Sequence, residues 1–278
     1  SVQIFKPKIV LMENVTGILN KSDDIRSDFL KIGYYGKPIK LRAQDYGVPQ
    51  NRVRVFFILI GPMFSEIEQI NMFNNIKMNI INSSNTHNNY VLKDAIDFLP
   101  SLERNTIPNQ TWYEHKSCGY FSSKNKIKKI NTYIESINKS NHINDYIFNH
   151  KAGYTNDRDF EIYSRLPQGG DSTHESIKDI NPYKNRSHIF KDKFYKLKED
   201  TISKAITAHM KVDTHMYIHP LKGRGLTPRE AARVQSFPDN YIFKGSFKNW
   251  YKQIGNAVPP KLAFAIVKCI KKELNKWS

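Results

Sequence analysis

Cysteine is scarce in this sequence: Cys118 and Cys269 are the only two in 278 residues, and they lie far apart. Two such cysteines form neither a disulfide framework nor the paired spacing of a zinc finger. This fits a reducing, cytoplasmic compartment. The sequence also has no apolar run of about 18 residues or more and no signal-peptide pattern at its start. These absences predict a protein with no membrane span and no structural metal.

Acidic residues are few compared with basic ones. The chain has 43 lysines and arginines against 26 aspartates and glutamates, which gives a formal charge of +17. A chain this basic typically binds a polyanion, because lysine and arginine release counterions from phosphates. The alternative is a coding sequence biased toward lysine and asparagine, since many of the lysines are scattered rather than arranged in stripes. The charge favours nucleic acid as a partner and leaves both explanations open.

Two continuous apolar runs in the first sixty residues predict buried strands. They cover residues 8–12 and 53–60, and their apolar character on both faces is typical of a covered parallel sheet. Residues 23–32 predict a helix between them, and Tyr46-Gly47-Val48-Pro49 predicts a turn. Strand, helix and strand in this order indicate an α/β fold.

The pattern changes after Pro62. Residues 71–90 are rich in asparagine and poor in periodicity, so we expect a loop or linker there. A short helix is expected within residues 91–102. Residues 104–205 are polar, basic and aromatic without long helical periodicity. They predict a second, irregular domain.

Helical signals return near the C-terminus. In Thr227-Pro228-Arg229-Glu230, threonine can cap, proline suits the first helical position and glutamate completes a capping box. This helix should end before Pro238. A last helix should begin near Pro260 and pack an apolar stripe on the sheet. The stripe consists of Leu262, Ala263, Ile266, Val267, Ile270 and Leu274.

Four segments resemble, in the same order, the later motifs of cytosine-5 DNA methyltransferases. They are PKIVLMENV at 7–15, DYGVPQNRVRVF at 45–56, RGLTPREAARVQSFPD at 224–239 and QIGNAVPP at 253–260. Each alone is moderately specific or weaker. Their order, interrupted by a variable basic insert, makes the resemblance specific.

The resemblance implies a partial Rossmann-like methyltransferase domain with a second, irregular target-recognition domain. Residues 1–103 would be the C-terminal half of the catalytic α/β domain, 104–245 the target-recognition domain and hinge, and 246–278 a return segment and helix packing on the catalytic domain. The implied activity is methyl transfer from S-adenosylmethionine to carbon 5 of a flipped cytosine in double-stranded DNA. The implied setting is restriction-modification in a bacterial or phage-infected cell.

Two motifs of that family do not occur among the 278 residues. These are the Phe-x-Gly-x-Gly turn that holds the cofactor and the Pro-Cys-Gln loop that carries the nucleophile. We therefore expect most of the cofactor pocket on a second polypeptide and a chain that is inactive without it. The alternative is a catalytically inactive DNA-binding remnant, and tRNA methylation is a third, less favoured alternative.

The resemblance assigns a catalytic role to three residues. Glu13, at the end of the first strand, would stabilise charge on the cytosine ring by a hydrogen bond or proton donation at the ring nitrogen. Arg52 and Arg54 alternate with valines and would hold the base oxygen and organise the nucleophile loop, because guanidinium has fixed donors and a permanent charge. The alternative for each is an ordinary charged residue at a strand end or edge.

Supporting roles fall to other motif residues. Asn256 and Ala257 resemble the segment that closes over the methionine end of the cofactor. The alternative, which is compatible with that role, is a helix-entry turn before Pro259. The resemblance also implies active-site or DNA support from Asn14, Gln50, Arg229 and Arg233, with a structural role favoured for both arginines. Cys118 lacks a Pro-Cys context and Cys269 lies near an apolar stripe, so neither is expected to be the nucleophile. The histidines have no metal-ligand spacing.

Overall fold

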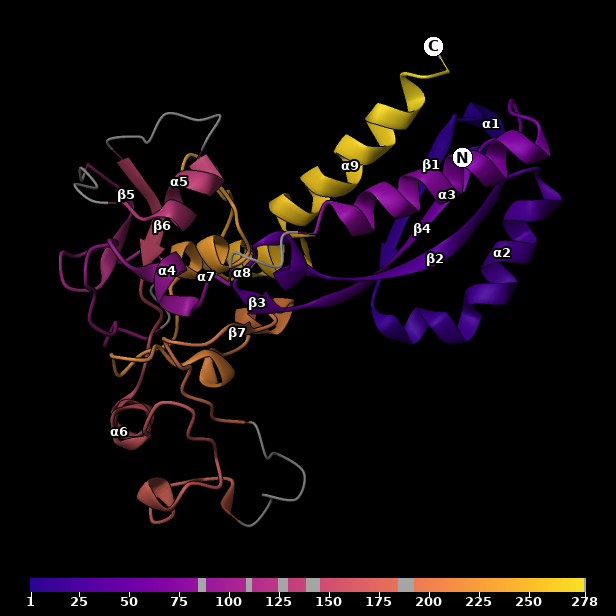
Figure 1. Ribbon diagram of the computed structural model, residues 1–278. Coiled ribbons are helices and arrows are strands. Elements are labelled where there is room, and N and C mark those ends of the chain that lie inside the picture. The colour runs from indigo at the N-terminus through magenta and orange to yellow at the C-terminus, as the bar shows by residue number, and fades with distance from the viewer. Residues whose placement is uncertain (85–88, 109–111, 125–129, 139–145, 185–192, 278) are drawn as a thin grey trace. The chain divides into compact units, whose positions relative to one another are not determined.

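A computed structural model describes residues 1–278 except 85–88, 109–111, 125–129, 139–145, 185–192 and 278 (Figure 1). The chain forms two compact units. The first comprises residues 1–47, 51–88 and 261–278, and the second comprises 48–50 and 89–260. The functional domain boundaries expected from the resemblance remain a prediction, because compactness does not assign function.

The first unit contains a three-stranded sheet in the order β1-β4-β2. Its strands are β1 (Ile9–Asn14), β2 (Tyr35–Arg42) and β4 (Val53–Ile60). Both neighbours run antiparallel to β4, so the expected parallel pairing of the two apolar runs is wrong. An apolar run indicates that a strand is buried, but it does not indicate whether the strand pairs parallel or antiparallel with its neighbours. The central strand β4 is buried from Val55 to Ile60, whereas Leu11 of β1 is 43% exposed.

Helices α2 (Ser22–Lys31) and α3 (Glu66–Asn82) belong to the same unit. The first confirms the helix expected at 23–32. The second corrects the expected loop at 71–90. Ser65 and Glu68 form a capping box, and a buried face compensates for the low helix propensity of asparagine. That face is Gln69, Met72, Phe73, Ile76 and Ile80.

The last helix, α9 (Pro260–Leu274), begins where the sequence predicts. Its buried face differs from the expected stripe, since Val267 is 52% exposed. The buried positions are Leu262, Ile266, Cys269 and Glu273. The Nδ2 atom of Asn75 on α3 donates a hydrogen bond to Glu273 at 2.9 Å. This contact turns the helix toward α3, beside which it lies in Figure 1.

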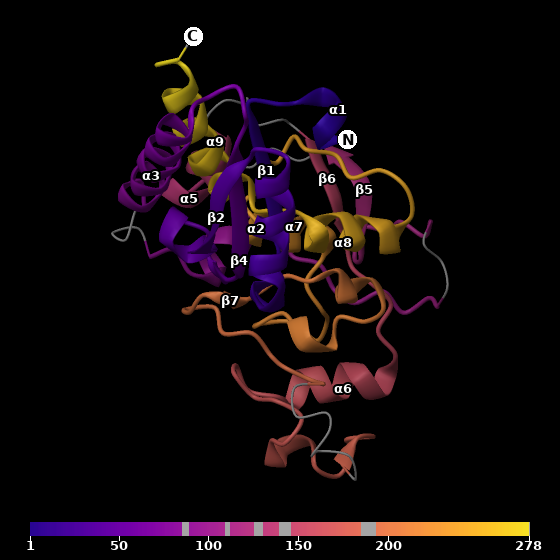
Figure 2. The same cartoon turned by 90° about the vertical axis from the view of Figure 1, so that its right-hand side faces the viewer.

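The second unit is built from short elements around α7 (Pro228–Val234), all seven of whose residues are buried. Thr227 and Glu230 form the expected capping box, with Pro228 in the first turn. The other helices are α4 (Leu92–Ile96), α5 (Thr132–Asn138), α6 (Asp157–Arg165) and α8 (Phe247–Asn256). Strands β5 (Gly119–Lys124) and β6 (Tyr146–Lys151) pair antiparallel. Figure 2 shows the same elements from the side.

Among the described residues, no helix is long and apolar enough to cross a membrane. The same residues contain no group of three or more histidine, cysteine, aspartate or glutamate side chains that could hold a metal ion.

Candidate active site

Glu13 and Arg54 form an ion pair on one face of the sheet in the first unit. Glu13 of β1 lies directly opposite Phe56 of β4, and Arg54 is two residues from Phe56. Side chains two residues apart share a face of a strand, so Glu13 and Arg54 are diagonal neighbours. The Arg54 Nε atom lies 3.0 Å from the Glu13 Oε1 atom, and the two side chains are 16% and 26% exposed. The sheet thus presents a positioned, partly accessible carboxylate.

Hydrogen bonds close to this pair restrain the Arg54 side chain and the backbone at the end of β1. Arg54 also donates from Nη1 to the carbonyl oxygen of Val53 at 2.7 Å, which restrains its guanidinium. Arg52 lies just before β4 and is 2% exposed. The side chain of Asn14 accepts a hydrogen bond from the backbone N–H of Val15 at 2.8 Å, where the strand ends. Asn14 therefore shapes the turn that follows Glu13.

Gln50 lies in the second unit and is fully buried there. Its Nε2 atom donates to Gln235 Oε1 at 2.6 Å, and its Oε1 atom accepts from the backbone N–H of Ile206 at 3.1 Å. Gln235 in turn donates to the carbonyl oxygen of Ile254 at 2.7 Å. Two amide side chains thus join three of the four motif segments. Gln235 was missed at the sequence level, although it is a polar residue within a quoted motif.

Glycine is required for steric reasons at position 255, near the end of α8. A Cβ atom at Gly255 would collide with the backbone of Thr207 and Ala208, so only glycine permits this close approach. Asn256, the last residue of α8, is exposed, and Ala257 is half-buried. The side chain of Asn256 has no hydrogen-bond partner among the described residues. Its amide can donate and accept hydrogen bonds to a ligand.

Arg229 is completely buried. Its guanidinium donates to the backbone carbonyl oxygens of Phe148, Pro238 and Tyr241 at 2.8, 3.2 and 2.6 Å. Burial lowers the pKa of Arg229 to about 10, so the side chain remains charged at neutral pH. These contacts leave no accessible group for a DNA phosphate and favour a structural role.

Arg233 is also completely buried. It holds Asp239 through two hydrogen bonds of 2.8 and 2.9 Å and the carbonyl oxygen of Asp97 at 3.0 Å. Burial acts to raise the pKa of Asp239, but Arg233 holds it below the ordinary value. The two expected support arginines therefore stabilise the second unit from within.

A buried ion pair that the sequence did not reveal lies beside α7. Arg224 makes two hydrogen bonds of 2.8 Å to Glu230, and the side chains are 2% and 3% exposed. Glu230 also accepts from the backbone N–H of Thr227 at 2.7 Å. His150 and His219 adjoin this group, and burial lowers the pKa of each to about 4. Both histidines are therefore neutral at physiological pH.

Comparison with known proteins identifies the family. The C-5 cytosine-specific DNA methylase family matches residues 1–272. The chain belongs to that family. The expected family assignment and its α/β, Rossmann-like fold are thus confirmed.

Three curated methyltransferases of 29–31% identity cover nearly the whole chain. The putative type II methyltransferase M.OihORF3336P of Oceanobacillus iheyensis is 29% identical over 96% of this chain and 69% of its own length. M.Bpa9945I of Bacillus paralicheniformis is 31% identical over 99% and 62%. M.DdeI of Desulfomicrobium norvegicum is 31% identical over 97% and 64%. The chain thus spans 62–69% of the length of these relatives.

One solved structure resembles the fold of this methylase-family chain over 99% of its residues. It is a putative DNA modification methyltransferase encoded within an Escherichia coli prophage. The TM-score is 0.68, the identity is 23%, and 72% of that protein is covered. The similarity supports the fold, and the roles of individual residues rest on the geometry of this chain.

Proposed function

We propose that this chain takes part in methyl transfer from S-adenosylmethionine to carbon 5 of a flipped cytosine in double-stranded DNA. The observation that carries the proposal is the 3.0 Å ion pair between Arg54 and Glu13. It holds a carboxylate at the end of a strand, where α/β sheets place ligands. The type II methyltransferase names of the relatives support a restriction-modification role in a bacterial or phage-infected cytoplasm.

Glu13 acts on the ring nitrogen of the cytosine. Addition of a thiolate at carbon 6 leaves negative charge on the ring. Glu13 in its protonated form stabilises that charge by donating a hydrogen bond or its proton to the ring nitrogen, which leaves the carboxylate paired with Arg54. Arg54 positions that carboxyl group and supplies further donors toward the base oxygen. Arg52, buried before the same strand, supports this edge of the sheet.

Asn256 and Ala257 fit one end of the cofactor. The exposed amide of Asn256 has no partner among the described residues and suits the polar methionine end of S-adenosylmethionine. The cofactor supplies the methyl group when it is bound. This chain's contribution is to orient that end through the turn after α8.

The proposal places the nucleophile outside these 278 residues. Cys118 is 1% exposed, and burial raises the pKa of its thiol. Cys269 is 7% exposed and lies on the packed face of α9. Reactive cysteines instead need access and a stabilised thiolate. In its specific form, the proposal is a split enzyme whose second polypeptide carries the cofactor turn and the Pro-Cys loop.

A reconstitution assay tests the proposal. The chain is mixed with a family fragment carrying the two absent motifs, and transfer of labelled methyl groups to DNA is measured. Glu13→Gln should lower the rate at least about 100-fold, because general acid catalysis contributes about that much or more. Affinity for DNA should stay within about two-fold, since the substitution leaves phosphate contacts intact.

Glu66→Gln is the matched control, because Glu66 is an exposed carboxylate in the first turn of α3. It should methylate like the unaltered chain. Unchanged turnover in Glu13→Gln would remove Glu13 from the mechanism. No methylation by any combination of fragments would refute the split enzyme.

A further inference from the structure

Gln235 is a fully buried glutamine that follows α7, and its side chain reaches the end of α8. Its Nε2 atom donates to the carbonyl oxygens of Ile254 and Ala257 at 2.7 and 3.3 Å. These two carbonyl groups lie on either side of Asn256, the last residue of α8. One side-chain nitrogen therefore holds the backbone both before and after Asn256.

The end of α8 benefits from a donor outside the helix. The last four carbonyl groups of a helix have no partner within it. Just beyond α8, Pro259 and Pro260 have no backbone N–H to donate. A buried side-chain amide can supply the donors instead, and the Gln235 amide does so at Ile254 and Ala257.

Gln50 fixes the direction in which the Gln235 amide points. It is fully buried, and its Nε2 atom donates to the Oε1 atom of Gln235 at 2.6 Å and to the carbonyl oxygen of Val234 at 3.1 Å. An amide NH₂ group donates hydrogen bonds and does not accept them. The Oε1 atom of Gln235 must therefore face Gln50, and its NH₂ group must face the end of α8. The opposite orientation would place two NH₂ groups together and an oxygen against two carbonyl oxygens.

The same two glutamines hold the segment against which the end of α8 packs. The Oε1 atom of Gln50 accepts from the backbone N–H of Ile206 at 3.1 Å. The next residue, Thr207, lies so close to Gly255 that a Cβ atom at position 255 would collide with its carbonyl group. Gln50 and Gln235 thus restrain both sides of this close contact.

Asn256 is the polar side chain that this arrangement leaves available. It is exposed and has no hydrogen-bond partner among the described residues. Because its backbone is held on both sides, little backbone entropy remains to be lost when its amide binds a ligand. A group that is held in advance in its binding orientation binds more tightly than the same group on a mobile turn.

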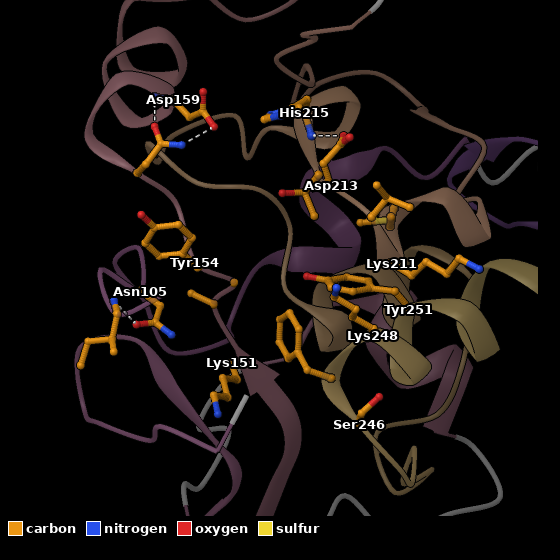
Figure 3. Close-up of a pocket in the computed structure, with 18 of the residues that line it drawn as sticks. Asn105, Lys151, Tyr154, Asp159, Lys211, Asp213, His215, Ser246, Lys248 and Tyr251 are labelled. Atoms are coloured by element: carbon orange, nitrogen blue, oxygen red, sulfur yellow. Dashed lines mark hydrogen bonds between the residues drawn. The ribbon is translucent and has the colours of Figure 1, made fainter. Parts of the chain in front are cut away.

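The rest of α8 has its own anchors. The hydroxyl group of Tyr251 donates to the carbonyl oxygen of Leu226 at 2.5 Å, and the Ser246 side chain caps the first turn. Tyr251 and Ser246 also line a cavity of the second unit, whose wall does not include Gln235 (Figure 3). Loss of the Gln235 amide should therefore loosen the turn after α8 and leave the helix body and the cavity in place.

We propose that Gln235 is a positioning residue for the cofactor and holds the Asn256 amide in the orientation that binds S-adenosylmethionine. Gln235 acts through Asn256 and does not itself touch the cofactor, because its side chain is fully buried and its donors and acceptor are all used within the protein. The inference rests on the proposed function, which assigns Asn256 to the methionine end of the cofactor.

Hydrogen exchange on the chain alone tests whether Gln235 holds this turn. Gln235→Met fills a similar volume but removes the donors to Ile254 and Ala257. The backbone amides of residues 255–258 should exchange about ten-fold faster or more in the variant, because local opening becomes easier. Those of residues 229–233 in α7 should stay within about two-fold.

Gln253→Met is the matched control. Gln253 is an exposed glutamine of α8 whose Nε2 atom also donates to two backbone carbonyl oxygens, those of Lys244 and Asn249, at 2.8 and 3.2 Å. The same substitution removes the same number of hydrogen bonds there, and exchange at residues 255–258 should stay within about two-fold. If Gln235→Met does not fold, Gln235→Asn should give the expected pattern, since it keeps a buried amide that is one methylene group too short to reach both partners.

Kinetics of the chain reconstituted with the family fragment test the role toward the cofactor. Gln235→Met should raise KM for S-adenosylmethionine about ten-fold and leave KM for DNA and kcat within about three-fold. A loss of folded protein would lower the rate without this selective change. In a double-mutant cycle with Asn256→Ala, the combined variant should raise that KM by no more than about two-fold beyond the larger single effect, because Gln235 acts through Asn256.

The outcomes separate this inference from the proposed function. Unchanged exchange at residues 255–258 in Gln235→Met would overturn it, as would independent effects of the two substitutions in the cycle. If the unaltered chain methylates DNA and Gln235→Met has the same cofactor KM as Gln253→Met, only the positioning role is wrong. If the unaltered chain does not methylate, the proposed function fails and the cofactor role fails with it, while exchange still decides whether Gln235 holds the turn.

Discussion

Lowering the pH from 7 to 5 should destabilise the second unit through His150 and His219. Burial lowers the pKa of each to about 4, from an ordinary value of 6.5. The unfolded chain therefore binds protons more readily than the folded one. The stabilisation is fully present above pH 6.5 and is lost as the pH falls toward 4.

The expected loss is large compared with the stability of a domain. A difference of 2.5 pKa units corresponds to about 3 kcal/mol for each histidine when the loss is complete, and to about 2 kcal/mol at pH 5. Two histidines would lose about 4 kcal/mol together, from a typical total of about 5 to 15 kcal/mol. His215 changes in the same direction, because burial also lowers its pKa.

Carboxylates change the free energy of unfolding at lower pH than the histidines do. Burial acts to raise the pKa of Glu230, but Arg224 holds it below the ordinary value of 4.5. Stability from this carboxylate is present above about pH 4.5 and is lost below it. The interval from pH 7 to 5 therefore reports mainly on the histidines.

Guanidinium unfolding at several pH values tests this prediction. Trp250 is 5% exposed in the second unit, so its fluorescence should report that unit once Trp112 and Trp277 are replaced by phenylalanine. The variant His150→Asn/His219→Gln should start less stable and lose about 4 kcal/mol less between pH 7 and 5. An equal loss in the variant and its parent would refute the reasoning.

Four further outcomes follow from the structure. The chain alone should neither methylate DNA nor bind S-adenosylmethionine tightly, and labelled methyl transfer by the purified chain would contradict this. It should bind duplex DNA weakly and with strong salt dependence because its charge is +17; anisotropy showing salt-independent binding would contradict this. Arg224→Met should lower the free energy of unfolding by about 3 to 5 kcal/mol, because it leaves Glu230 buried without its cation. In denaturant titrations, Arg224→Met/Glu230→Leu should recover part of that free energy. Gly255→Ala should cost about 1 to 3 kcal/mol through collision with Thr207, whereas Gly17→Ala, in open space, should be nearly neutral.

Local signals in the sequence were sufficient for several elements. The helix at 22–31, the capping box of Thr227 and Glu230 and the start of α9 near Pro260 all depend on residues within a few positions of one another. The four motif segments were sufficient to predict the family, because their order and residue types can be read from the sequence without knowing which residues are in contact.

Predictions from local composition were wrong where contacts between distant segments decide the structure. The asparagines of α3 suggested a loop, but a single buried face and the Ser65 cap keep the segment helical. The face of α9 turned away from the predicted stripe because Glu273 meets Asn75 across about two hundred residues of sequence. Such contacts leave no periodic pattern in the chain.

The sequence by itself determined the family and the α/β class, and it supplied the candidate site residues. Only the tertiary structure decided that β1 and β4 run antiparallel, which makes Glu13 and Arg54 diagonal neighbours. It also decided that Arg229 and Arg233 are buried inside the second unit. The physical reason is that strand direction and burial depend on contacts between distant segments, which local sequence patterns do not encode.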